Sequence, residues 1–578
     1  MKRIYKNGRI YTADVNNPWA DTVIIEDCVF TFVGKETDLG AADIAETRLE
    51  ISSESETWEN RKNGEASEVY DLGGHFVIPG LIDAHTHIGL SVIMGEDDEM
   101  PVWDCQSKQE VLEKLRLYVK KHPFRLYYSM FFGQAEALGS EGLNRREIDQ
   151  VVKHRPVVLI DQECHSAWLN SRALKYLGIT EDIQDPAPGY SYYERDKNGK
   201  LTGCLKEMTM LPLLEMNGKK SDREMKKGIL KIMNYLLERG VTTVYDAGNY
   251  LDEESNYRLL AEMDRNGELP LRYEATHIID VPSKAENAIE EFKRLKELYE
   301  TEHMKFKTIK IMFDGTHRAH TAKLVEPYND ADTVGGTMLS SEELYILMKE
   351  LNHEKIDFHA HTVGEGASRM ILDCIEQIKK EESFDIIVTL AHLESQRDED
   401  IPRFKELGVI ADYSPHWHGG NDYAGMEATS KLLGAKRAYN LFRADTMIKS
   451  GAIVTFSSDE VTLSLLDRWN PYLGIEIGHT RQEVNDGGRD AGIFPPEEER
   501  LSIEDLIKGY TINAAYALRL DDEIGSIQTG KSGDMVILDD NLFEMDPYRI
   551  HEVMPEAVIV RGDTVKGSIE RFGTLSEK

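Results

Sequence analysis

Short apolar runs of strand length recur along the middle of this 578-residue chain, with amphipathic segments such as 340–354 between them. Counting VIPGLIDAHTHI at 77–88 as the first, there are eight such runs. The other seven lie at 240–248, 271–279, 308–316, 355–364, 385–394, 408–417 and 452–460. Strands that alternate with helices form a parallel sheet, and eight of them can close a barrel. The pattern therefore predicts an α/β fold with a TIM-type (β/α)8 barrel over residues 76–519.

The two ends of the chain follow another pattern, that of short hairpin strands. Residues 1–40 alternate apolar and polar positions and turn at glycine, and the segment after residue 520 does the same. We therefore predict one small β-sandwich domain that is composed of residues 1–75 plus 520–578. The polar, acidic segment 42–68 between two of its strands is expected to form an exposed excursion.

Histidines and one aspartate stand at the carboxyl ends of the predicted barrel strands. His85 and His87 end the first strand and share a face, because side chains in a strand repeat every two residues. His361, His392 and Asp459 end the fifth, sixth and eighth strands. A lone histidine pair is usually a half-buried feature with satisfied hydrogen bonds. Five such residues at strand ends, which converge on one face of a barrel, predict a metal centre.

Neutral imidazoles and carboxylates suit Zn²⁺ best, and other divalent transition metals fit the same geometry. The first-strand pair with Asp459 can hold one ion, and the histidines of strands five and six can hold a second, which gives one or two ions per chain. Lys310 on the fourth strand is the candidate bridge. A bare ammonium would be repelled by two cations, whereas a lysine carbamate formed with CO2 is anionic and bidentate. The alternative is that Lys310 binds no metal and pairs with an acid such as Asp314.

This set of residues predicts hydrolysis by metal-activated hydroxide. A bound metal lowers the pKa of water to about 7, so hydroxide is available at neutral pH. Asp459 can take a proton as the general base and later return one to the leaving group as the acid. The ion held by His361 and His392 would polarise a substrate carbonyl. The expected reaction is cleavage of a carbon–nitrogen or similar polar bond.

Composition and charge limit the classes of partner and the cellular location that we expect for this protein. The chain is 41% hydrophobic and 30% charged, as globular proteins are, and its five cysteines are scattered without a C-x-x-C pair. This cysteine usage favours a reducing, cytoplasmic location. No stretch reaches membrane-spanning length, and 103 acidic against 68 basic residues give a net charge of −35 that disfavours nucleic-acid binding. We expect a small-molecule substrate, with neither nucleic acid nor membrane as partner.

Several motifs are similar to those of a known family: VIPGLIDAHTH, FSSDE, TGKSGDMVILD, CHSAWLNSRAL and TGCLKE. Together with the strand-four lysine they resemble the amidohydrolase superfamily, in particular the YtcJ-like branch (amidohydrolase family 3) that includes N-substituted formamide deformylase. The resemblance implies a metal-dependent barrel with a two-ended β-sandwich, and an insertion over 95–235 that forms the lid and substrate region. It also implies a small N-substituted amide or formamide as substrate, and it makes a homodimer plausible.

The same resemblance suggests substrate-binding residues. His165 and Trp168, in CHSAWLNSRAL, match family positions that resemble substrate-pocket residues. The competing interpretation of this stretch is a helix start capped by Asn170 or Ser171. His416, in DYSPHWH, is a third candidate that could orient the substrate from strand seven, as could His418, although a surface loop explains both almost as well. Glu207, in TGCLKE, is predicted to be structural, and a catalytic role is the alternative.

The sequence also departs from the family pattern. Glu365 replaces the aspartate of the usual strand-five motif, Ser414 replaces a glutamine after strand seven, and Glu460 replaces a small residue after Asp459. An extra histidine, His359, lies on the same strand face as the strand-five ligand and is a candidate donor to a metal ligand. These changes leave the predicted metal site intact and put the substrate class in doubt.

Two alternatives remain open at this point. A mononuclear deaminase of the same superfamily would lack the strand-four lysine and would carry a glutamate three residues after the strand-five histidine. Here Gly364 occupies that position and Glu365 follows it. A non-enzymatic scaffold would have lost ligand positions, and this sequence retains all of them.

Overall fold

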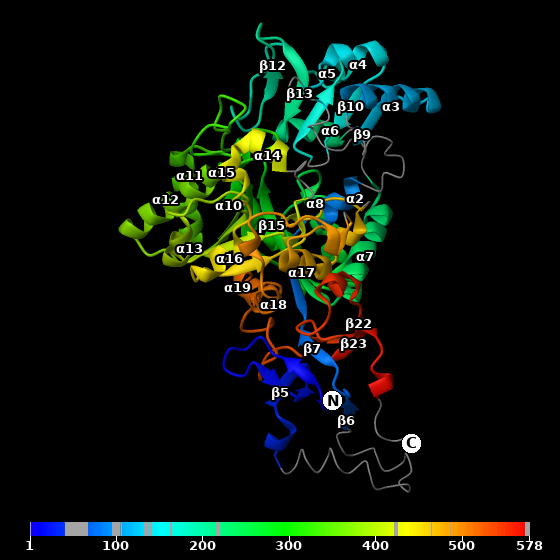
Figure 1. Cartoon of the computed structure of the whole chain (residues 1–578), viewed down its shortest axis with the longest axis vertical. Helices are drawn as coiled ribbons and strands as arrows, with labels where there is room; N and C mark the ends of the chain where they lie inside the picture. Colours follow the sequence, from blue (N-terminus) through cyan, green and yellow to red (C-terminus); the bar gives the residue numbers. More distant parts are fainter. Residues whose placement is uncertain are drawn as a thin grey trace.

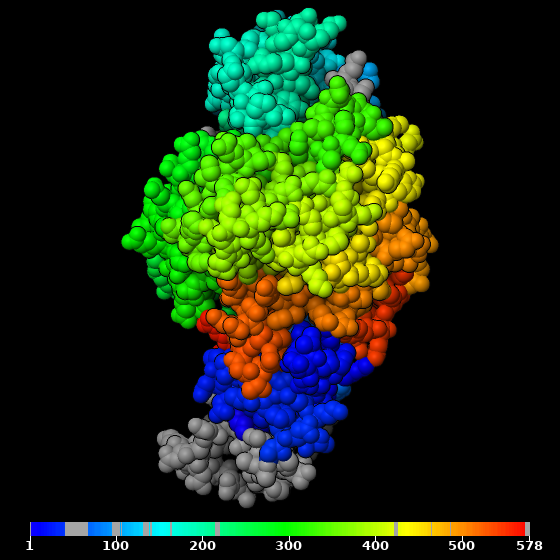
Figure 2. Space-filling model, turned by 90° about the vertical axis from the view of Figure 1, so that its left-hand side faces the viewer, coloured from blue at the N-terminus to red at the C-terminus, as the bar shows by residue number. Residues whose placement is uncertain are grey.

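The molecule is built in three tiers, which Figure 2 shows stacked along its long axis: the insertion, the barrel and the sheets of the chain ends. The computed structural model describes residues 2–40, 67–94, 105, 107–131, 138, 142–161, 164–215, 220–420, 426–463, 465–485 and 487–572. Nearly all of the predicted acidic excursion 42–68 lies outside the described residues. No helix in the described part of the chain has the length and apolar character needed to cross a bilayer.

The central tier is a parallel barrel, as predicted. Its eight strands pair in chain order, each with the next. They are β8 (Leu81–Thr86), β14 (Val241–Asp246), β15 (Arg272–Ile279), β16 (Met304–Met312), β17 (Asp357–Thr362), β18 (Val388–His392), β19 (Val409–Tyr413) and β20 (Val454–Phe456). The ring closes just beyond the last strand, where the N–H of Asp459 donates to the carbonyl of His85 over 3.0 Å. Metal-ligand candidates are therefore joined by the backbone as well as by their side chains.

The predicted first barrel strand proves to be two strands. β7 (Phe76–Pro79) belongs to the chain-end sheet, where it pairs with β21 (Met535–Leu538), and only β8 enters the barrel. Gly80 separates them, and a Cβ at this position would collide with the side chain of Thr242 on β14. The apolar run is continuous because both halves are buried, so periodicity alone could not reveal the division.

Amphipathic helices cover the outside of the barrel (Figure 1). Helix α11 (Ser341–Glu354) illustrates why they form, because Ser340 and Glu343 build a reciprocal capping box at its first turn. The other principal helices of this layer are α7 (Asp222–Glu238), α8 (Glu253–Arg265), α10 (Ala288–Tyr299), α12 (Glu365–Glu381), α13 (Ile401–Leu407), α16 (Ala444–Lys449), α17 (Pro471–Thr480), α18 (Ile503–Gly509) and α19 (Ile512–Ala517). Their apolar faces and the strands form one large core.

Both ends of the chain build the lowest tier in Figure 1, as predicted for a small β-domain. One sheet has the order β5-β4-β1-β6 and the other the order β23-β22-β21-β7-β2-β3. Their remaining strands are β1 (Lys2–Lys6), β2 (Arg9–Tyr11), β3 (Trp19–Ala20), β4 (Thr22–Glu26), β5 (Val29–Gly34), β6 (Ser67–Asp71), β22 (Pro555–Val560) and β23 (Asp563–Gly567). Apolar residues from both sheets, among them Tyr5, Val77 and Ile537, pack into a shared core. This tier adjoins the amino ends of the barrel strands, because β7 leads directly into β8.

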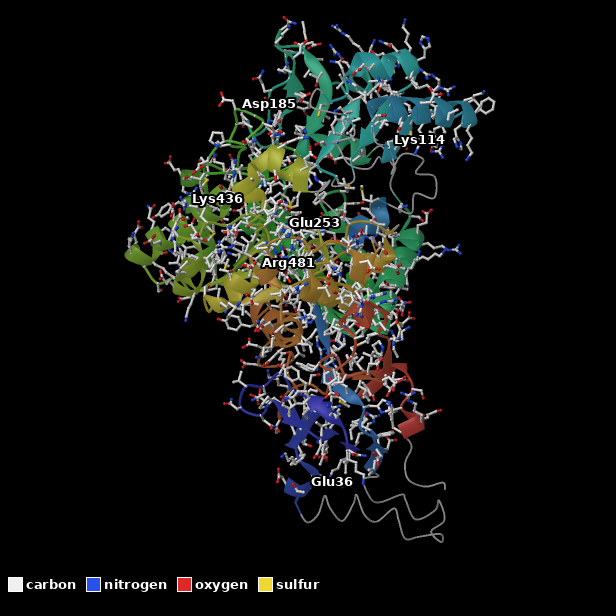
Figure 3. All side chains as sticks on the ribbon, in the orientation of Figure 1. Glu36, Lys114, Asp185, Glu253, Lys436 and Arg481 are labelled. Atoms are coloured by element: carbon white, nitrogen blue, oxygen red, sulfur yellow. The ribbon has the colours of Figure 1, made fainter. Side chains whose placement is uncertain are left out.

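The insertion forms the opposite tier, where Figure 3 labels Lys114 and Asp185, whereas Glu36 is labelled among the chain-end sheets. Its sheet has the order β12-β13-β11-β10-β9. Its elements are α3 (Lys108–Lys121), β9 (Tyr128–Phe131), α4 (Arg145–Val151), β10 (Val157–Ile160), β11 (Ser166–Leu169), α5 (Ser171–Tyr176), β12 (Tyr193–Arg195), β13 (Leu201–Lys206), the 3-10 turn η4 (Glu207–Met210) and α6 (Leu211–Glu215). Within the predicted range 95–235, α7 differs from the rest because its apolar face, including Ile229 and Met233, is part of the barrel core.

Candidate metal centre

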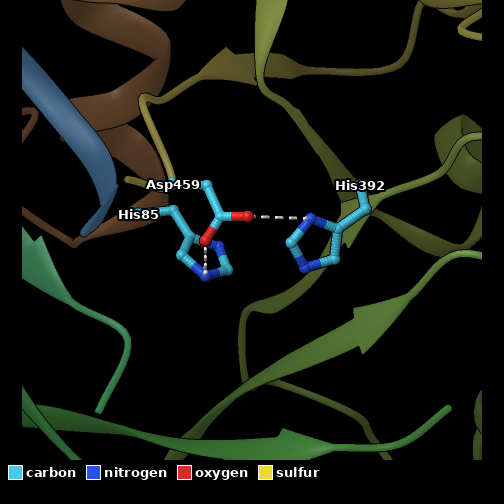
Figure 4. A group of neighbouring side chains, drawn as sticks. All are labelled: His85, His392 and Asp459. Carbon is cyan, nitrogen blue, oxygen red and sulfur yellow. Dashed lines mark ion pairs between the residues drawn. The ribbon is translucent and has the colours of Figure 1, made fainter. Parts of the chain in front are cut away.

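A carboxylate lies among three imidazoles at the carboxyl ends of the barrel strands. Asp459 Oδ1 is 3.3 Å from His85 Nε2 and 3.4 Å from His87 Nε2. Its other oxygen is 3.5 Å from His392 Nδ1, and Figure 4 shows the carboxylate between the rings of His85 and His392. Asp459 thus joins the first strand of the barrel to the sixth across the mouth.

Lys310 and His361 complete the group. Lys310 Nζ lies 3.3 Å from His85 Nε2, and the centroids of the His361 and His392 rings are 4.2 Å apart. All six side chains predicted from the sequence as metal ligands are therefore neighbours at one end of the barrel.

Asp314 has other partners than the lysine proposed for it. It accepts backbone N–H groups of Val363 and Gly364, each at 2.9 Å, and one oxygen lies 3.4 Å from His361 Nδ1. Within the described residues, Asp314 and Lys310 form no ion pair. Asp314 instead holds the turn after β17 and orients His361, an arrangement common for a carboxylate behind a metal-binding histidine.

The charge state of these groups suits a cation. Burial, reinforced by neighbouring cationic groups, holds the pKa values of His85, His361 and His392 well below the usual value for histidine. Burial also lowers the pKa of Lys310 to about 7. Neutral imidazoles offer lone pairs, and His392 Nε2 is buried without a hydrogen-bond partner among the described residues.

The donor set itself matches a divalent ion. Ligand atoms of His85, His392 and Asp459 all lie within 4.8 Å of one another. Two imidazole nitrogens and a carboxylate oxygen, with further imidazoles at hand, are the donors that Zn²⁺ and related metals take in hydrolases. The residues therefore fit a catalytic metal ion. A bound ion would also explain why His392 Nε2 is buried without a hydrogen-bond partner among the described residues.

A second polar layer lies beneath His85, inside the barrel. His359 Nε2 is 3.2 Å and Asp412 Oδ2 is 3.6 Å from His85 Nδ1, the ring nitrogen that faces away from Asp459. Sequence analysis singled out His359 and missed Asp412. The available signal was an acidic residue within the apolar run of the seventh strand. Burial raises the pKa of Asp412 to about 8, while hydroxyl donors from Thr455 and Ser457 bond to its oxygens.

A cavity of about 400 Å³ opens above the metal-ligand candidates. Its lining combines their side chains with apolar ones such as Leu90, Met208 and Tyr250, and with residues of both the insertion and the loop after β20. His165 and His416 contribute to the lining, so the structure brings these two candidates to the site. His416 Nε2 lies 3.0 Å from the carbonyl of Asn470, and burial lowers its pKa to about 4.

Trp168 is placed elsewhere. Strand alternation turns its side chain into the core of the insertion with Leu115, Tyr128 and Leu159, and it takes no part in the described lining of the cavity. The predicted substrate contact for Trp168 is therefore not supported by its position. Asn170 caps α5 by accepting the N–H of Ala173, as the helix-start interpretation of this stretch requires.

Glu207, which the sequence pointed to as structural, lies in the cavity lining. Its Oε2 is 2.5 Å from His165 Nδ1. His418, by contrast, is buried beside Phe442 and does not belong to the described lining. No local sequence pattern could have shown that Glu207 lies in the cavity lining and His418 outside it. Each residue follows a strand in a turn, and the direction of the turn decides whether the side chain faces the cavity.

Sequence comparison gives the family. The profile of the Amidohydrolase family matches residues 68–566, which is most of the chain. The chain belongs to the amidohydrolase family. It is a hydrolase, and this family membership confirms the resemblance inferred from the motifs and removes the scaffold alternative.

Relatives of this amidohydrolase carry different names. It is 25% identical over 470 residues to the exoenzymes regulatory protein AepA of Pectobacterium carotovorum subsp. carotovorum, covering 78% of this chain and 92% of that protein. It is 24% identical over 547 residues to the N-substituted formamide deformylase of Arthrobacter pascens, covering 92% of each chain. A crystal structure of an uncharacterized metal-dependent hydrolase from Pyrococcus horikoshii OT3 superposes with a TM-score of 0.65 at 20% identity, over 95% of this chain and 99% of that one, which supports the fold.

Proposed function

We propose that this amidohydrolase cleaves the carbon–nitrogen bond of a small N-substituted amide or formamide, using one or two Zn²⁺ ions. The observation that carries the proposal is the convergence of four histidines, Lys310 and Asp459 on one cavity. The coverage of the deformylase relative over nearly the full length of both chains supports this bond type. The cavity volume suits a small molecule better than a peptide or polymer.

A divalent ion bound by these residues would supply Lewis acidity and lower the pKa of water to about 7. Asp459 then takes one proton from the attacking water as the water oxygen bonds to the carbonyl carbon. When the carbon–nitrogen bond breaks, its electron pair stays on nitrogen and Asp459 returns the proton there. The products are an acid and an amine, and the carboxylate is restored.

Lys310 is proposed to carry a carbamate. Its side chain is fully buried and lies 3.3 Å from a nitrogen of His85, a position where an ammonium would repel a bound cation. Its lowered pKa leaves much of the amine uncharged at neutral pH, the form that adds CO2 with release of a proton. The resulting anion could bridge two ions.

The deaminase alternative is disfavoured by the position of Glu365. This residue begins α12 and accepts the hydroxyl of Ser395 at 3.0 Å, and it does not belong to the described lining of the cavity. We therefore favour amide hydrolysis over deamination.

The deciding experiment is a substrate screen with the metal-replete protein. N-Formyl and N-acyl amines, cyclic amides and esters are offered, with release of acid, amine and ammonia measured in parallel. Acid and amine release from the amides supports the proposal. Ammonia release from aminated heterocycles without amide cleavage would replace it with the deaminase.

A further inference from the structure

The two most exposed large apolar side chains of the described residues stand two positions apart in the insertion. Phe124 is 92% exposed and Leu126 is 86% exposed, and both lie in the turn between α3 and β9. Leu117, about two turns earlier on α3, is a further 57% exposed. Figure 1 shows α3 at the outer margin of the insertion tier. Single apolar side chains on a surface are ordinary, whereas three such side chains on one short segment mark a surface that meets a partner.

Basic side chains accompany this apolar group. Lys120 and Lys121 occupy the last turn of α3, and both are exposed. They share a face of the helix with Leu117, because residues three and four positions apart are neighbours on a helix. Neither lysine forms an ion pair with a described residue. Residues 114–126, KLRLYVKKHPFRL, contain five Lys or Arg and no Asp or Glu, in a chain whose net charge is −35. The segment is therefore a basic island on an acidic protein.

The turn that carries Phe124 and Leu126 is anchored from behind by Tyr128. This side chain is fully buried in the core of the insertion, and its hydroxyl donates to the carbonyl of His122 at 3.0 Å. The same hydroxyl accepts the guanidinium of Arg155 at 2.6 Å, which adds another cation beside the turn. Both ends of the turn are thus attached to the core while the two apolar side chains between them face solvent.

The combination of charge and apolar exposure favours an anionic lipid surface as the partner. Lysines are attracted to anionic headgroups, and apolar side chains next to them enter the boundary between headgroups and acyl chains. The acidic remainder of the protein is repelled by the same surface, so that only this face is presented. A two-fold contact between copies would place the lysines of one patch against those of the other. Leucine side chains also offer no ring on which a nucleic-acid base could stack.

We propose that the basic–apolar patch formed by Leu117, Lys120, Lys121, Phe124 and Leu126 docks this protein reversibly on an anionic lipid surface. Phe124 and Leu126 enter the lipid boundary, and the two lysines contact lipid phosphates. The patch shares no residue with the described cavity lining, so the inference is independent of the proposed reaction. The expectation of no membrane partner rested on the net charge of the whole chain and on the lack of a spanning segment, and neither describes a local patch.

The test is co-sedimentation of the full-length protein with lipid vesicles, either of phosphatidylcholine alone or of equal parts phosphatidylcholine and phosphatidylglycerol. The native protein should bind the mixed vesicles more tightly than the neutral ones, and added salt should weaken binding. Phe124→Ser and Leu126→Ser should each lower the partition coefficient about tenfold, because one apolar side chain is lost from the lipid. Lys120→Gln and Lys121→Gln should each lower it about fivefold on the mixed vesicles. Circular dichroism checks that these exposed substitutions leave the fold intact.

The chain offers a matched control for each kind of change. Val15→Ser removes a 79% exposed apolar side chain from the chain-end tier, and Lys380→Gln removes an exposed lysine from the last turn of α12. Both variants should bind as the native protein does. The proposal is overturned if the native protein fails to bind the mixed vesicles, or if the controls lose as much binding as the patch variants. A dimer in sedimentation equilibrium that Phe124→Ser abolishes, without vesicle binding, would assign the patch to a second copy instead.

Discussion

The barrel mouth and the insertion contribute to the same cavity by different means. Each ligand candidate of the mouth sits at or just beyond the end of a strand, in a parallel sheet whose backbone hydrogen bonds fix its position. The insertion contributes His165 through a turn, and side-chain bonds from Glu207 and Asp161 hold it in place. The backbone of the barrel therefore positions the metal-ligand candidates, whereas a few side-chain contacts position His165.

Removing the metal should have the largest effect. Strong chelators should reduce activity to background, with recovery on adding Zn²⁺, and His392→Ala should lower the metal equivalents measured by elemental analysis. His353→Ala, on the exposed face of α11, is the control and should keep its metal. Full activity in a metal-free sample would end the hydrolase mechanism proposed above.

Asp459→Asn should lower kcat by roughly 10²–10⁴-fold, the range for loss of a general acid–base group. The fold should persist, because the backbone bond from residue 459 to His85 does not involve the side chain. Steady-state rates and circular dichroism check both statements. A decrease of less than tenfold would show that another group takes the proton.

Lys310→Ala should lower the metal content toward one ion per chain and remove most of the activity, which short carboxylates should partly restore by replacing the bridge. Native mass spectrometry under CO2 should reveal a labile mass equal to one CO2 on the unmutated protein. A single metal in the native protein, with an unmodified lysine, would contradict the bridging role.

His359→Phe and Asp412→Asn should each weaken metal binding or activity by roughly 10–100-fold, as is usual for groups behind a metal ligand. The reason is that both act on His85 Nδ1 and so on the orientation of the ring. Competition with a coloured chelator measures the affinity. Unchanged metal affinity in both variants would mean that the orientation of His85 does not depend on His359 or Asp412.

Trp168→Ala should have the smallest effect on the metal. It empties part of the core of the insertion, and an aromatic-to-alanine change of this kind costs about 3–5 kcal/mol. Chemical denaturation should show the destabilisation while metal content stays native. Loss of metal in this variant would show that the metal site depends on the core of the insertion, contrary to this prediction.

The barrel and the positions of its metal-ligand candidates were predictable because both follow local rules. Alternating strands and helices give the fold, and polar residues at strand ends give the site, so His85, His361 and Asp459 were identified without knowledge of distant contacts. The division of the first run at Gly80 was not predictable, since burial on both sides of it hides the change of sheet.

The insertion resisted prediction for a physical reason. Its strands pair in an order that departs from the chain order, so which face of β11 meets the cavity depends on partners far along the sequence. That is why the sequence could not show that His165 reaches the described cavity lining and that Trp168, three residues on, does not. The sequence did not reveal the positions of Glu207 and Asp412 in the site. A buried carboxylate can be identified only from the groups that hydrogen-bond to it, and here these groups come from other elements.

Gly80 also has a thermodynamic consequence. It is the only residue between β7 of the chain-end sheets and β8 of the barrel, the strand that carries His85. If one of these strands detached from its core, it would therefore displace the other. We expect these two tiers to melt together as one cooperative unit in calorimetry. The insertion has apolar clusters of its own and can open at a lower temperature, which would make it the first part of the enzyme to yield to heat or proteases.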